Sequence, residues 1–356
     1  MEIVTFHTHW RIGDMAITAK ELAKKLNLSA TAVSMALNNK PGVSTATRDQ
    51  VIKAAEKYGY DFTRLSLKNG HSGDIYCIIY RAHNAILNYM PIFSELTDGI
   101  EQECRKQGYQ LKLVQINEKR DDVQKWIEDL RIANCAGIIL LGTETSIHVC
   151  KMFLQLSVPV LLLDSHFDSL GCSSVLINNR QGAYLATSLL IHQCGSQPGY
   201  MRSSYRIGNF EERRIGFDTA LREHGMSLSN SVIHELAPSI EGALSDMLEI
   251  IDREVPLAKC YFADNDLIAI GAMKALKLRG FRIPEDVAIA GFDNISESRI
   301  VEPSLTTIDI PRTFMGQTAA RQLIHQITTP VPHTVKIEIS TKLVRRFSVR
   351  SAVGIS

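Results

Sequence analysis

Hydrophobic runs in this sequence of 356 residues are short, and the longest, such as residues 158–163, have the length of a strand. None approaches the roughly 18 residues that are needed to cross a bilayer, which argues against a membrane protein. Residues 1–14 lack both a basic start and a continuous apolar stretch, so they do not read as a secretory signal. We therefore expect a cytoplasmic protein.

Cysteine pairs and enzyme signatures are missing as well. The seven cysteines are odd in number and form no C-x-x-C pair, a pattern typical of reduced thiols in a cytosolic protein. The sequence has no glycine-rich dinucleotide fingerprint, P-loop, G-x-S-x-G elbow or zincin motif. His7 and His9 could form a metal pair, although their surroundings are more typical of a solvated tail. We expect no enzyme activity, no metal and no cofactor.

Charge is almost balanced over the whole chain, at +1, but it is unevenly distributed. Residues 15–70 contain nine basic and four acidic side chains, a net charge of +5, while residues 71–356 carry a net charge of −3. A basic module is therefore joined to an acidic one, as expected if only the first contacts the phosphates of a nucleic acid.

The basic module is predicted to form three short helices. Thr18 and Glu21 form a capping box for a helix that runs to about Leu26, while Ser29 and Ser44 are placed to cap two further helices. The side chains expected to face a common core are Leu22, Ala23 and Leu26, then Ala32, Val33, Ala36 and Leu37, then Val51, Ile52, Ala55 and Tyr58.

Only a few residues separate the first two helices, which is typical of a helix-turn-helix motif. In that motif, the N-terminal residues of the second helix enter the major groove of DNA. A plain three-helix bundle is the alternative that the pattern leaves open.

The segment 18–60 resembles the headpiece of the lactose/galactose-repressor family. The similarity rests on LSATAVSMALN, on VSTATRDQV and on a closing Gly-Tyr. The stretch from Met15 to Thr18 also resembles a family N-terminus, which implies that residues 1–14 are an extension or a misassigned start. The resemblance implies that Thr31 and Met35 read bases, with Ala30 beside them. It also implies that phosphates are bound by Ser29, Ser34, Asn38, Ser44, Thr47 and Arg48. Thr31 and Met35 can contact a thymine methyl group but cannot make a bidentate contact to a purine, so apolar and shape readout should dominate.

The linker over residues 61–73 departs from the family pattern. It lacks the usual proline and is shorter by about two residues than the hinge that the resemblance implies. Leu67 is the best candidate for the leucine that wedges into the minor groove. The alternative is a flexible tether in which Leu65 or Leu67 packs on the headpiece.

Strand-like and helix-like segments alternate from Asp74 onward. The predicted strands are DIYCIIY, YQLKLVQI, AGIILLG, PVLLLD, SVLIN, GYMRSS, KCYFAD and DVAIAGF, and amphipathic stretches such as 92–107 and 181–194 lie between them. This alternation predicts a doubly wound α/β fold with parallel sheets, an architecture that many functions share.

Five motifs in this region resemble the effector domain of the same family, which is similar to periplasmic sugar-binding proteins. They are VPVLLLD, ERRIGF, ADNDLIAIGAM, IPEDVAIAGFDN and PSLTTI. The resemblance implies two doubly wound lobes over residues 74–350, followed by a tail over residues 351–356.

By the same resemblance, Asp164, Arg213, Asn265 and Asp293 line a cleft between the lobes, at strand ends where such folds bind ligands. Alternatively, the aspartates and the asparagine could cap turns or helices, and Arg213 could pair with Glu212. Arg81 and His83 would suit an anionic group on the effector, although two surface residues fit equally well. Around Ile240, where sugar-binding members often present an aromatic ring, the sequence has only Pro-Ser-Ile.

These observations predict a DNA-binding transcriptional regulator, expected to be a repressor, that forms a homodimer on a pseudo-palindromic operator. A small-molecule effector, expected to be a sugar or a sugar derivative, would control its affinity for the operator. The alternative is a solute-binding protein or an α/β enzyme with an appended helical module.

Overall fold

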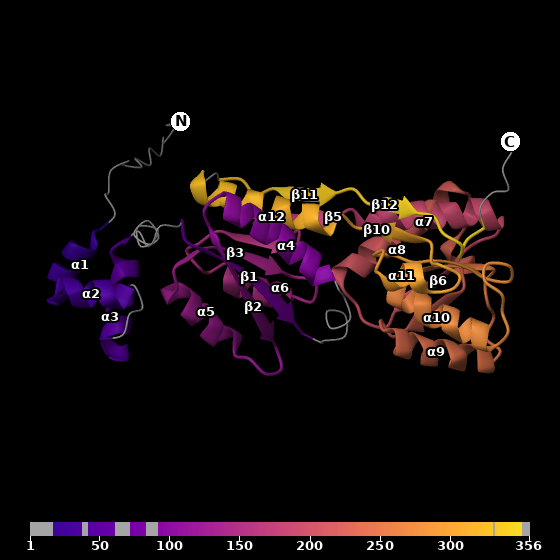
Figure 1. The fold of residues 1–356 in the computed structure, drawn as a ribbon, viewed down its shortest axis with the longest axis horizontal. Helices are drawn as coiled ribbons and strands as arrows, with labels where there is room; N and C mark the ends of the chain where they lie inside the picture. Colours follow the sequence, from indigo (N-terminus) through magenta and orange to yellow (C-terminus); the bar gives the residue numbers. More distant parts are fainter. Residues whose placement is uncertain (1–16, 38–41, 61–71, 83–91, 330–331, 351–356) are drawn as a thin grey trace, which may run out of the picture.

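A helical headpiece precedes a two-lobed α/β domain in the computed structural model, which describes residues 17–37, 42–60, 72–82, 92–329 and 332–350 (Figure 1). The predicted fold class is confirmed. No helix within these ranges is both long enough and apolar enough to cross a membrane.

The headpiece contains α1 (Ala19–Leu26), α2 (Ala30–Leu37) and α3 (Thr45–Lys57). The predicted capping box is present, because Glu21 N donates to Thr18 Oγ1 at 3.2 Å and Thr18 N donates to a Glu21 carboxylate oxygen at 2.8 Å. Asn27 ends α1 in the left-handed region, with φ of 54°, and Ser29 Oγ then accepts the amide of Ala32 at 3.0 Å. Local sequence signals therefore set the helix boundaries.

The core of the headpiece matches the predicted pattern except at Ala32, which is half-buried outside the core cluster, and at Tyr58. Leu22, Val33 and Val51 are fully buried in it, whereas Tyr58 is 40% exposed. The expectation for Tyr58 was wrong because α3 ends at Lys57, so Tyr58 leaves the helical face. Tyr60 is buried in its place, and its amide donates to Ala55 O.

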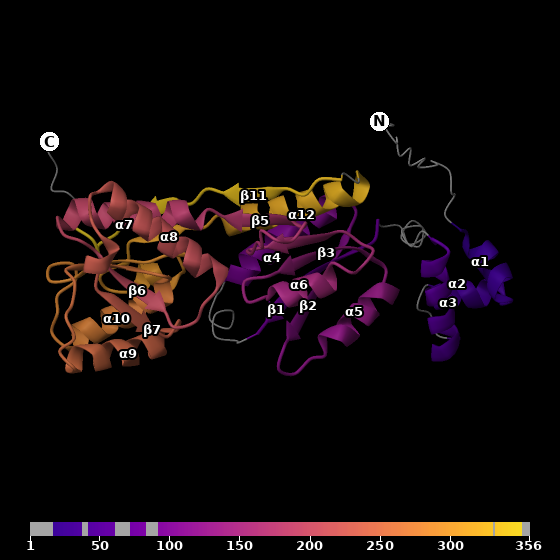
Figure 2. The same cartoon turned by 180° about the vertical axis from the view of Figure 1, so that it is seen from behind.

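The first lobe is built on a six-stranded parallel sheet. Its elements in chain order are β1 (Asp74–Arg81), α4 (Ile92–Lys106), β2 (Gln110–Asn117), α5 (Val123–Ile132), β3 (Cys135–Leu141), α6 (Ile147–Phe153), β4 (Val160–Leu163), β5 (Ser173–Ile177), α12 (Arg312–Thr328) and β11 (Lys336–Ile339). The strand order is β11-β5-β4-β3-β1-β2. Helices α4 and α12 pack on one face and α5 and α6 on the other, as Figure 2 shows from behind.

The second lobe has a four-stranded parallel sheet in the order β7-β6-β8-β9. Its elements are α7 (Asn179–Cys194), β6 (Gly199–Ser203), α8 (Gly208–Glu223), the 3-10 turn Leu228–Asn230, β7 (Ile233–Leu236), α9 (Ile240–Asp252), β8 (Cys260–Ala263), α10 (Asp266–Leu278), β9 (Ala288–Ala290), α11 (Glu297–Ile300), and the antiparallel pair β10 (Thr307–Asp309) and β12 (Lys342–Val344). Helices α7 and α8 cover one face of this sheet, and α9 and α10 cover the other.

The chain passes between the lobes three times, from β5 to α7, from β10 to α12 and from β11 to β12. One hydrophobic cluster continues through these crossings, from Ile177 and Ile310 to Phe217 and Phe292 in the second lobe. All eight predicted strands are present, but the sequence reading did not single out the short strands β7, β10, β11 and β12. The three crossings bring the carboxyl ends of both sheets toward one cleft.

Candidate effector and DNA-binding sites

The predicted DNA-reading face of α2 is open to solvent at most of its positions. Ser29, Ala30, Thr31 and Ser34 are exposed. Met35 is half-buried, because its sulfur lies against Gly42, where an added Cβ would come within 3.1 Å of Met35 Sδ. Gly42 has φ of +117°, a conformation that favours glycine, so the turn that leads into α3 supports the Met35 side chain.

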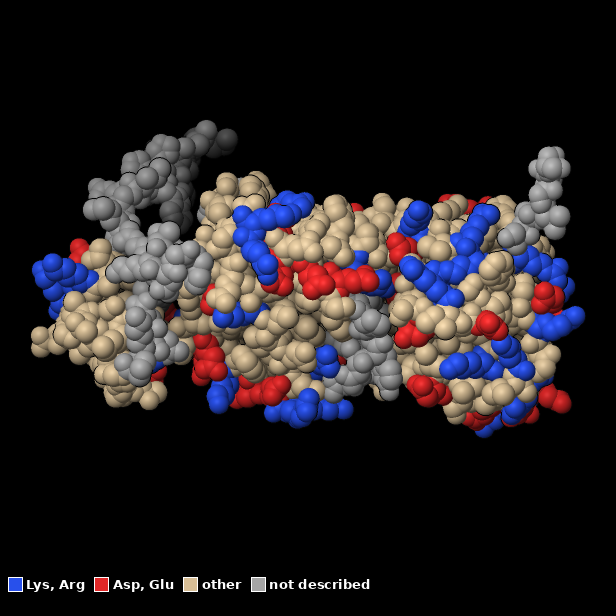
Figure 3. All heavy atoms as spheres, viewed as in Figure 1, with Lys and Arg blue, Asp and Glu red and all other residues tan. Residues whose placement is uncertain are grey.

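Three of the residues predicted to bind phosphates, Ser44, Thr47 and Arg48, lie at the start of α3. Ser44 Oγ accepts the amide of Thr47 at 3.1 Å and lies 2.7 Å from the Thr47 hydroxyl, so Ser44 also acts as the N-cap. Arg48 follows in the first turn and is half-buried. Figure 3 shows Lys and Arg side chains at the outer end of the headpiece, over α1. Asn38 and Leu67 lie outside the described residues, and so does His83 of the effector domain.

Met35 and Arg48 should have separable effects on operator binding. Met35→Ala should relax the base preference at one operator position, through the loss of an apolar contact worth about 1 kcal/mol. Arg48→Ala should weaken binding to all sequences to a similar degree, because a phosphate contact carries no sequence information. Selection from random DNA with each variant measures both effects. Identical profiles for Met35→Ala and the unaltered chain would remove Met35 from the reading face.

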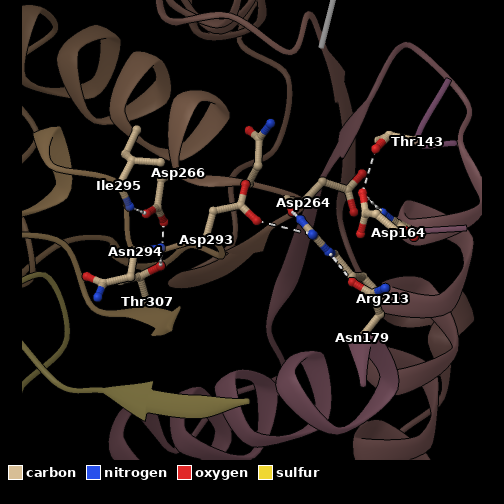
Figure 4. Close-up of polar contacts among 12 residues, drawn as sticks. Thr143, Asp164, Asn179, Arg213, Asp264, Asp266, Asp293, Asn294, Ile295 and Thr307 are labelled. Atoms are coloured by element: carbon tan, nitrogen blue, oxygen red, sulfur yellow. Dashed lines mark hydrogen bonds and ion pairs between the residues drawn. The ribbon is translucent and has the colours of Figure 1, made fainter. Parts of the chain in front are cut away.

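Three of the predicted effector residues line one compartment of the cleft. Asp164, Arg213 and Asp293 surround a space whose apolar walls include Phe93, from α4, and Met315, from α12. Figure 4 shows Arg213 between Asp293 and Asn179, with Asp164 beside it. The cleft thus combines polar groups from both lobes.

Arg213 is 4% exposed and is held by contacts on each of its guanidinium nitrogens. Nε donates to Asn179 Oδ1 at 2.9 Å, Nη1 donates to the Asp264 carbonyl, and Nη2 pairs with Asp293 Oδ1 at 3.1 Å. The guanidinium also lies 3.7 Å from the centre of the Phe292 ring. Arg213 therefore pairs with Asp293 and not with Glu212, whose carboxylate binds Arg180.

Asp164 lies directly after β4 and accepts two hydrogen bonds, from Thr143 Oγ1 at 2.6 Å and from Asn209 Nδ2 at 2.9 Å. Desolvation by burial raises the pKa of Asp164 to about 6, despite these hydrogen bonds and the charge of Arg213. Its φ is 60° and that of Asp293 is 107°. Positive φ angles are uncommon for residues other than glycine and strain the backbone. Strained residues are often retained at binding sites, so two aspartates with positive φ at one cleft are consistent with such a site.

Asp293 and Arg312 keep hydrogen-bonding capacity inside this compartment. Asp293 Oδ2 and Arg312 Nε are buried, and neither has a partner among the residues described. Burial raises the pKa of Asp293, although Arg213 and Arg312 oppose that shift. A buried polar atom without a partner is costly, so a polar ligand that supplied the missing partners would gain affinity.

Asn265 and Arg81 are positioned differently from the other predicted residues. Asn265 is the N-cap of α10, where its Oδ1 accepts a hydrogen bond from the amide of Ile268 at 2.9 Å. The structure therefore agrees with the alternative interpretation, in which Asn265 caps a helix. Its Nδ2 has no partner in the described part of the chain. Arg81 is half-buried at the end of β1, and neither residue lines the described cavities of the cleft.

A larger polar cavity of about 300 Å³ adjoins this compartment, and the two share Thr143, Asp164 and Asn209. The hydroxyls of Thr145 and Ser165 are buried in its wall, without a partner in the ranges that the structure covers. Phe167 contributes an aromatic ring to the lining. His166 lines the same cavity, and a set of hydroxyls, amides, carboxylates and rings suits a polyhydroxylated ligand.

Two further buried carboxylates support the cleft from the second lobe. Asp264 accepts Tyr200 OH at 2.5 Å and Ser203 N at 2.7 Å, and Asp266 accepts Thr307 Oγ1 and the amide of Ile295. Desolvation raises the pKa of Asp264 to about 6 and the pKa of Asp266 well above its usual value. The Asp264 carbonyl binds Arg213, so this network also positions the arginine of the cleft.

The raised pKa of Asp264 should make the two-lobed domain less stable as pH rises. The folded state holds this proton up to pH of about 6, while the unfolded state releases it near pH 4, so stability present below pH 4 is lost as pH rises through 6. The contribution is about 3 kcal/mol. Asp264→Asn should therefore flatten the pH dependence of the free energy of unfolding, measured by urea denaturation between about pH 4.5 and 8. Parallel curves for variant and parent would contradict the assignment.

Sequence reasoning did not identify several residues of the cleft. Thr143, Asn179 and Asn209 contact the predicted residues, and Arg312 donates to the Asp293 carbonyl. A signal did exist for Asn179, because it lies two residues after the buried strand β5 and such folds bind ligands near the carboxyl ends of their strands. The other three follow no pattern that the sequence displays.

Comparison with known proteins agrees with this geometry. Residues 18–61 match the family described as "Bacterial regulatory proteins, lacI family". Residues 73–347 match "Periplasmic binding proteins and sugar binding domain of LacI family". The chain belongs to the lacI family. It is a DNA-binding transcriptional repressor with a helix-turn-helix headpiece and a sugar-binding type of effector domain.

Similar members of the lacI family include two curated repressors. The ribose operon repressor of Halalkalibacterium halodurans is 31% identical over 92% of this chain and 96% of its own length. The transcriptional repressor PurR of Aliivibrio salmonicida is 28% identical over 93% of this chain and 98% of its own length. A solved lacI-family regulator from Enterococcus faecium with bound ribose is 26% identical, with a TM-score of 0.64 over 76% of this chain and 98% of its own.

Proposed function

We propose that this lacI-family repressor binds a sugar or sugar derivative in the interlobe cleft, through Asp164, Arg213 and Asp293. The observation that carries the proposal is the pair of unpartnered polar atoms, Asp293 Oδ2 and Arg312 Nε, which line the same compartment as Asp164 within the described structure. Carboxylate and guanidinium groups can each bind two neighbouring hydroxyls of a sugar. Neither Asn265 nor Arg81 lines the described cavities, and both are retained as outer candidates, Asn265 for an amide contact through Nδ2 and Arg81 for an anionic substituent.

The larger polar cavity extends this site toward Thr145 and Ser165. Two of the related proteins are a ribose operon repressor and a regulator with bound ribose, which makes pentoses the first compounds to test. The hydroxyls of Thr145 and Ser165, which have no partner among the described residues, favour a polyhydroxylated ligand.

DNA binding is assigned to the headpiece over residues 15–60, joined by a hinge over residues 61–73 to the effector domain over residues 74–350. Residues 1–14 and 351–356 are then an extension and a tail. Thr31 and Met35 would read bases, with Ala30 beside them, while phosphates would be bound by Ser29, Ser34, Asn38, Ser44, Thr47 and Arg48. Leu67 would act as the minor-groove wedge.

Control of DNA binding would follow from linkage between the lobes and the headpieces. A homodimer places two headpieces on the two halves of a pseudo-palindromic operator. An effector that prefers one arrangement of the lobes changes how the headpieces are presented, and the two affinities are then coupled reciprocally. The protein would act in the cytoplasm, where bacterial operators are found, and would have no catalytic role.

Effector binding should depend on the aspartates of the cleft. Calorimetry with pentoses and hexoses would first identify a ligand. Asp164→Asn and Asp293→Asn should then each weaken its binding by about tenfold or more, because a hydrogen bond to a charged group contributes about 1.5–3 kcal/mol.

The control for this experiment is Asp286→Asn. Asp286 is exposed on the second lobe and pairs with Arg282 at 2.7 Å, away from the cleft. Ligand affinity should be the same in this variant as in the parent. If Asp164→Asn and Asp293→Asn also leave the affinity unchanged and only alter the melting temperature, both residues are structural and the site lies elsewhere.

A further inference from the structure

Two histidines on neighbouring helices face each other on the second lobe, away from the residues of the cleft. His192 lies in the last turn of α7, and His224 is the C-cap of α8. Their Nε2 atoms are 3.2 Å apart, and their rings meet edge to face with centroids 4.9 Å apart. His192 is exposed and His224 is half-buried, so the pair is accessible from solvent.

The hydrogen bond on the far side of the His224 ring determines its tautomer. His224 Nδ1 lies 2.8 Å from the Ala220 carbonyl, which can only accept, so Nδ1 carries the proton. The Nε2 atom of a neutral His224 is then unprotonated, with its lone pair directed toward His192. A backbone carbonyl that holds the far nitrogen is the arrangement that orients histidines bound to metals.

The separation of the two nitrogens also fits a shared ion. Zinc binds imidazole nitrogen at about 2.0–2.1 Å, so two histidines on one tetrahedral ion place their nitrogens about 3.4 Å apart. If the nitrogen–metal–nitrogen angle is about 90°, the two nitrogens lie about 2.9 Å apart. The observed distance of 3.2 Å between the Nε2 atoms lies between these two values. His192 can turn its own Nε2 lone pair toward the ion by moving its proton to Nδ1, without a net change of charge.

The helices that carry the pair are held firmly together. At Gly216 of α8, an added Cβ would lie only 2.2 Å from Arg180 O of α7, so the helices approach as closely as glycine permits. A rigid scaffold that already sets the distance between two ligands reduces the cost of organising a site. Neighbouring Glu223 is engaged by Tyr184, whose hydroxyl donates to its carboxylate at 2.6 Å.

We propose that His192 and His224 form a solvent-accessible site for a divalent late first-row transition-metal ion such as Zn²⁺ or Cu²⁺. Imidazole suits these ions, and Cu²⁺ should bind more tightly than Zn²⁺. The described residues contain no cluster of three or more His, Cys, Asp or Glu placed to hold a metal, so water completes the coordination. Bound metal would join the C-terminal ends of α7 and α8 and stabilise the second lobe.

The test is a calorimetric titration of the full chain with Zn²⁺ and with Cu²⁺. His7 and His9 are first replaced by glutamine, because a His-x-His pair near the N-terminus could also bind these ions. In this background we expect binding of one ion per chain. His192→Gln and His224→Gln should each weaken it by about 10–100-fold or more, since loss of a ligand should cost at least as much as loss of an outer-shell partner.

His148→Gln is the matched control, because His148 is an exposed histidine of α6 on the first lobe. It should leave the titration unchanged. The spectrum of bound Cu²⁺ should show two equivalent nitrogen ligands in the background protein and one in either variant. Identical titrations for the background and the His192→Gln and His224→Gln proteins would overturn the proposal, and so would an equal loss in His148→Gln. Thermal unfolding without metal checks that each variant is folded.

Discussion

Arg213→Ala should lower the free energy of unfolding of the two-lobed domain by about 3–5 kcal/mol, because it leaves a buried charge without its partner. Asp293 is 1% exposed and pairs with Arg213 through Oδ1, while its Oδ2 already lacks a partner within the described ranges. The substitution also removes the donors to Asn179 and to the Asp264 carbonyl. Urea denaturation of the effector-free chain measures the loss, and effector binding should fall in the same variant.

Arg214→Ala is the control for this result. Arg214 is the next residue of α8, and its side chain is 38% exposed in pairs with Glu211 and Asp218. Exposed ion pairs contribute about 0–1 kcal/mol, so this variant should remain close to the parent. Equal stability losses at the two positions would show that Arg213 does not hold the cleft together in the way its contacts imply.

Leu22→Ala should abolish specific DNA binding by unfolding the headpiece. Leu22 is fully buried, and truncation of a buried leucine costs about 2–5 kcal/mol. A helical unit of about 45 residues has little stability to lose, because so small a domain buries a limited apolar area. Binding to a selected operator, measured by fluorescence anisotropy, should fall to the level of random DNA.

Leu26→Ala is the control for Leu22→Ala, because it is the same truncation at a half-buried position of α1. It should cost less and leave measurable operator binding. The unfolding of the two-lobed domain should be unchanged in both variants, since none of the buried residues of the headpiece core belongs to the lobes. Retention of full operator affinity by Leu22→Ala would contradict the assigned headpiece core.

Local signals explain why much of the fold could be predicted. The capping box at Thr18 and the left-handed Asn27 act within a few residues, and the buried strands read as continuous apolar runs. Tyr58 was misassigned because helical periodicity does not reveal where α3 stops. Strands β10 and β12 have three residues each and exist through pairing with one another, so no periodic pattern marks them.

The cleft was predictable only in part. The resemblance singled out Asp164 and Asp293 through the motifs VPVLLLD and IPEDVAIAGFDN, and both residues line the same compartment of the cleft. The contacts that set their chemistry are tertiary, such as Asn209 from α8 on Asp164 and Arg312 from α12 on Asp293. Arg213 pairs with Asp293, which is 80 positions away in the sequence, whereas its neighbour Glu212 accepts a hydrogen bond from Arg180. The spacing of charged residues in the sequence does not show whether an arginine pairs with a neighbouring carboxylate or with a distant one.

The most direct test of the account is the affinity of the full chain for an operator selected from random DNA, measured by anisotropy at fixed salt with and without the effector. We predict that the operator binds at least about 10³-fold more tightly than random DNA. We also predict that the effector shifts this affinity by about 5–150-fold, the usual range of coupling between two sites. Equal affinity for the operator and random DNA, with binding that follows salt concentration alone, would contradict the account.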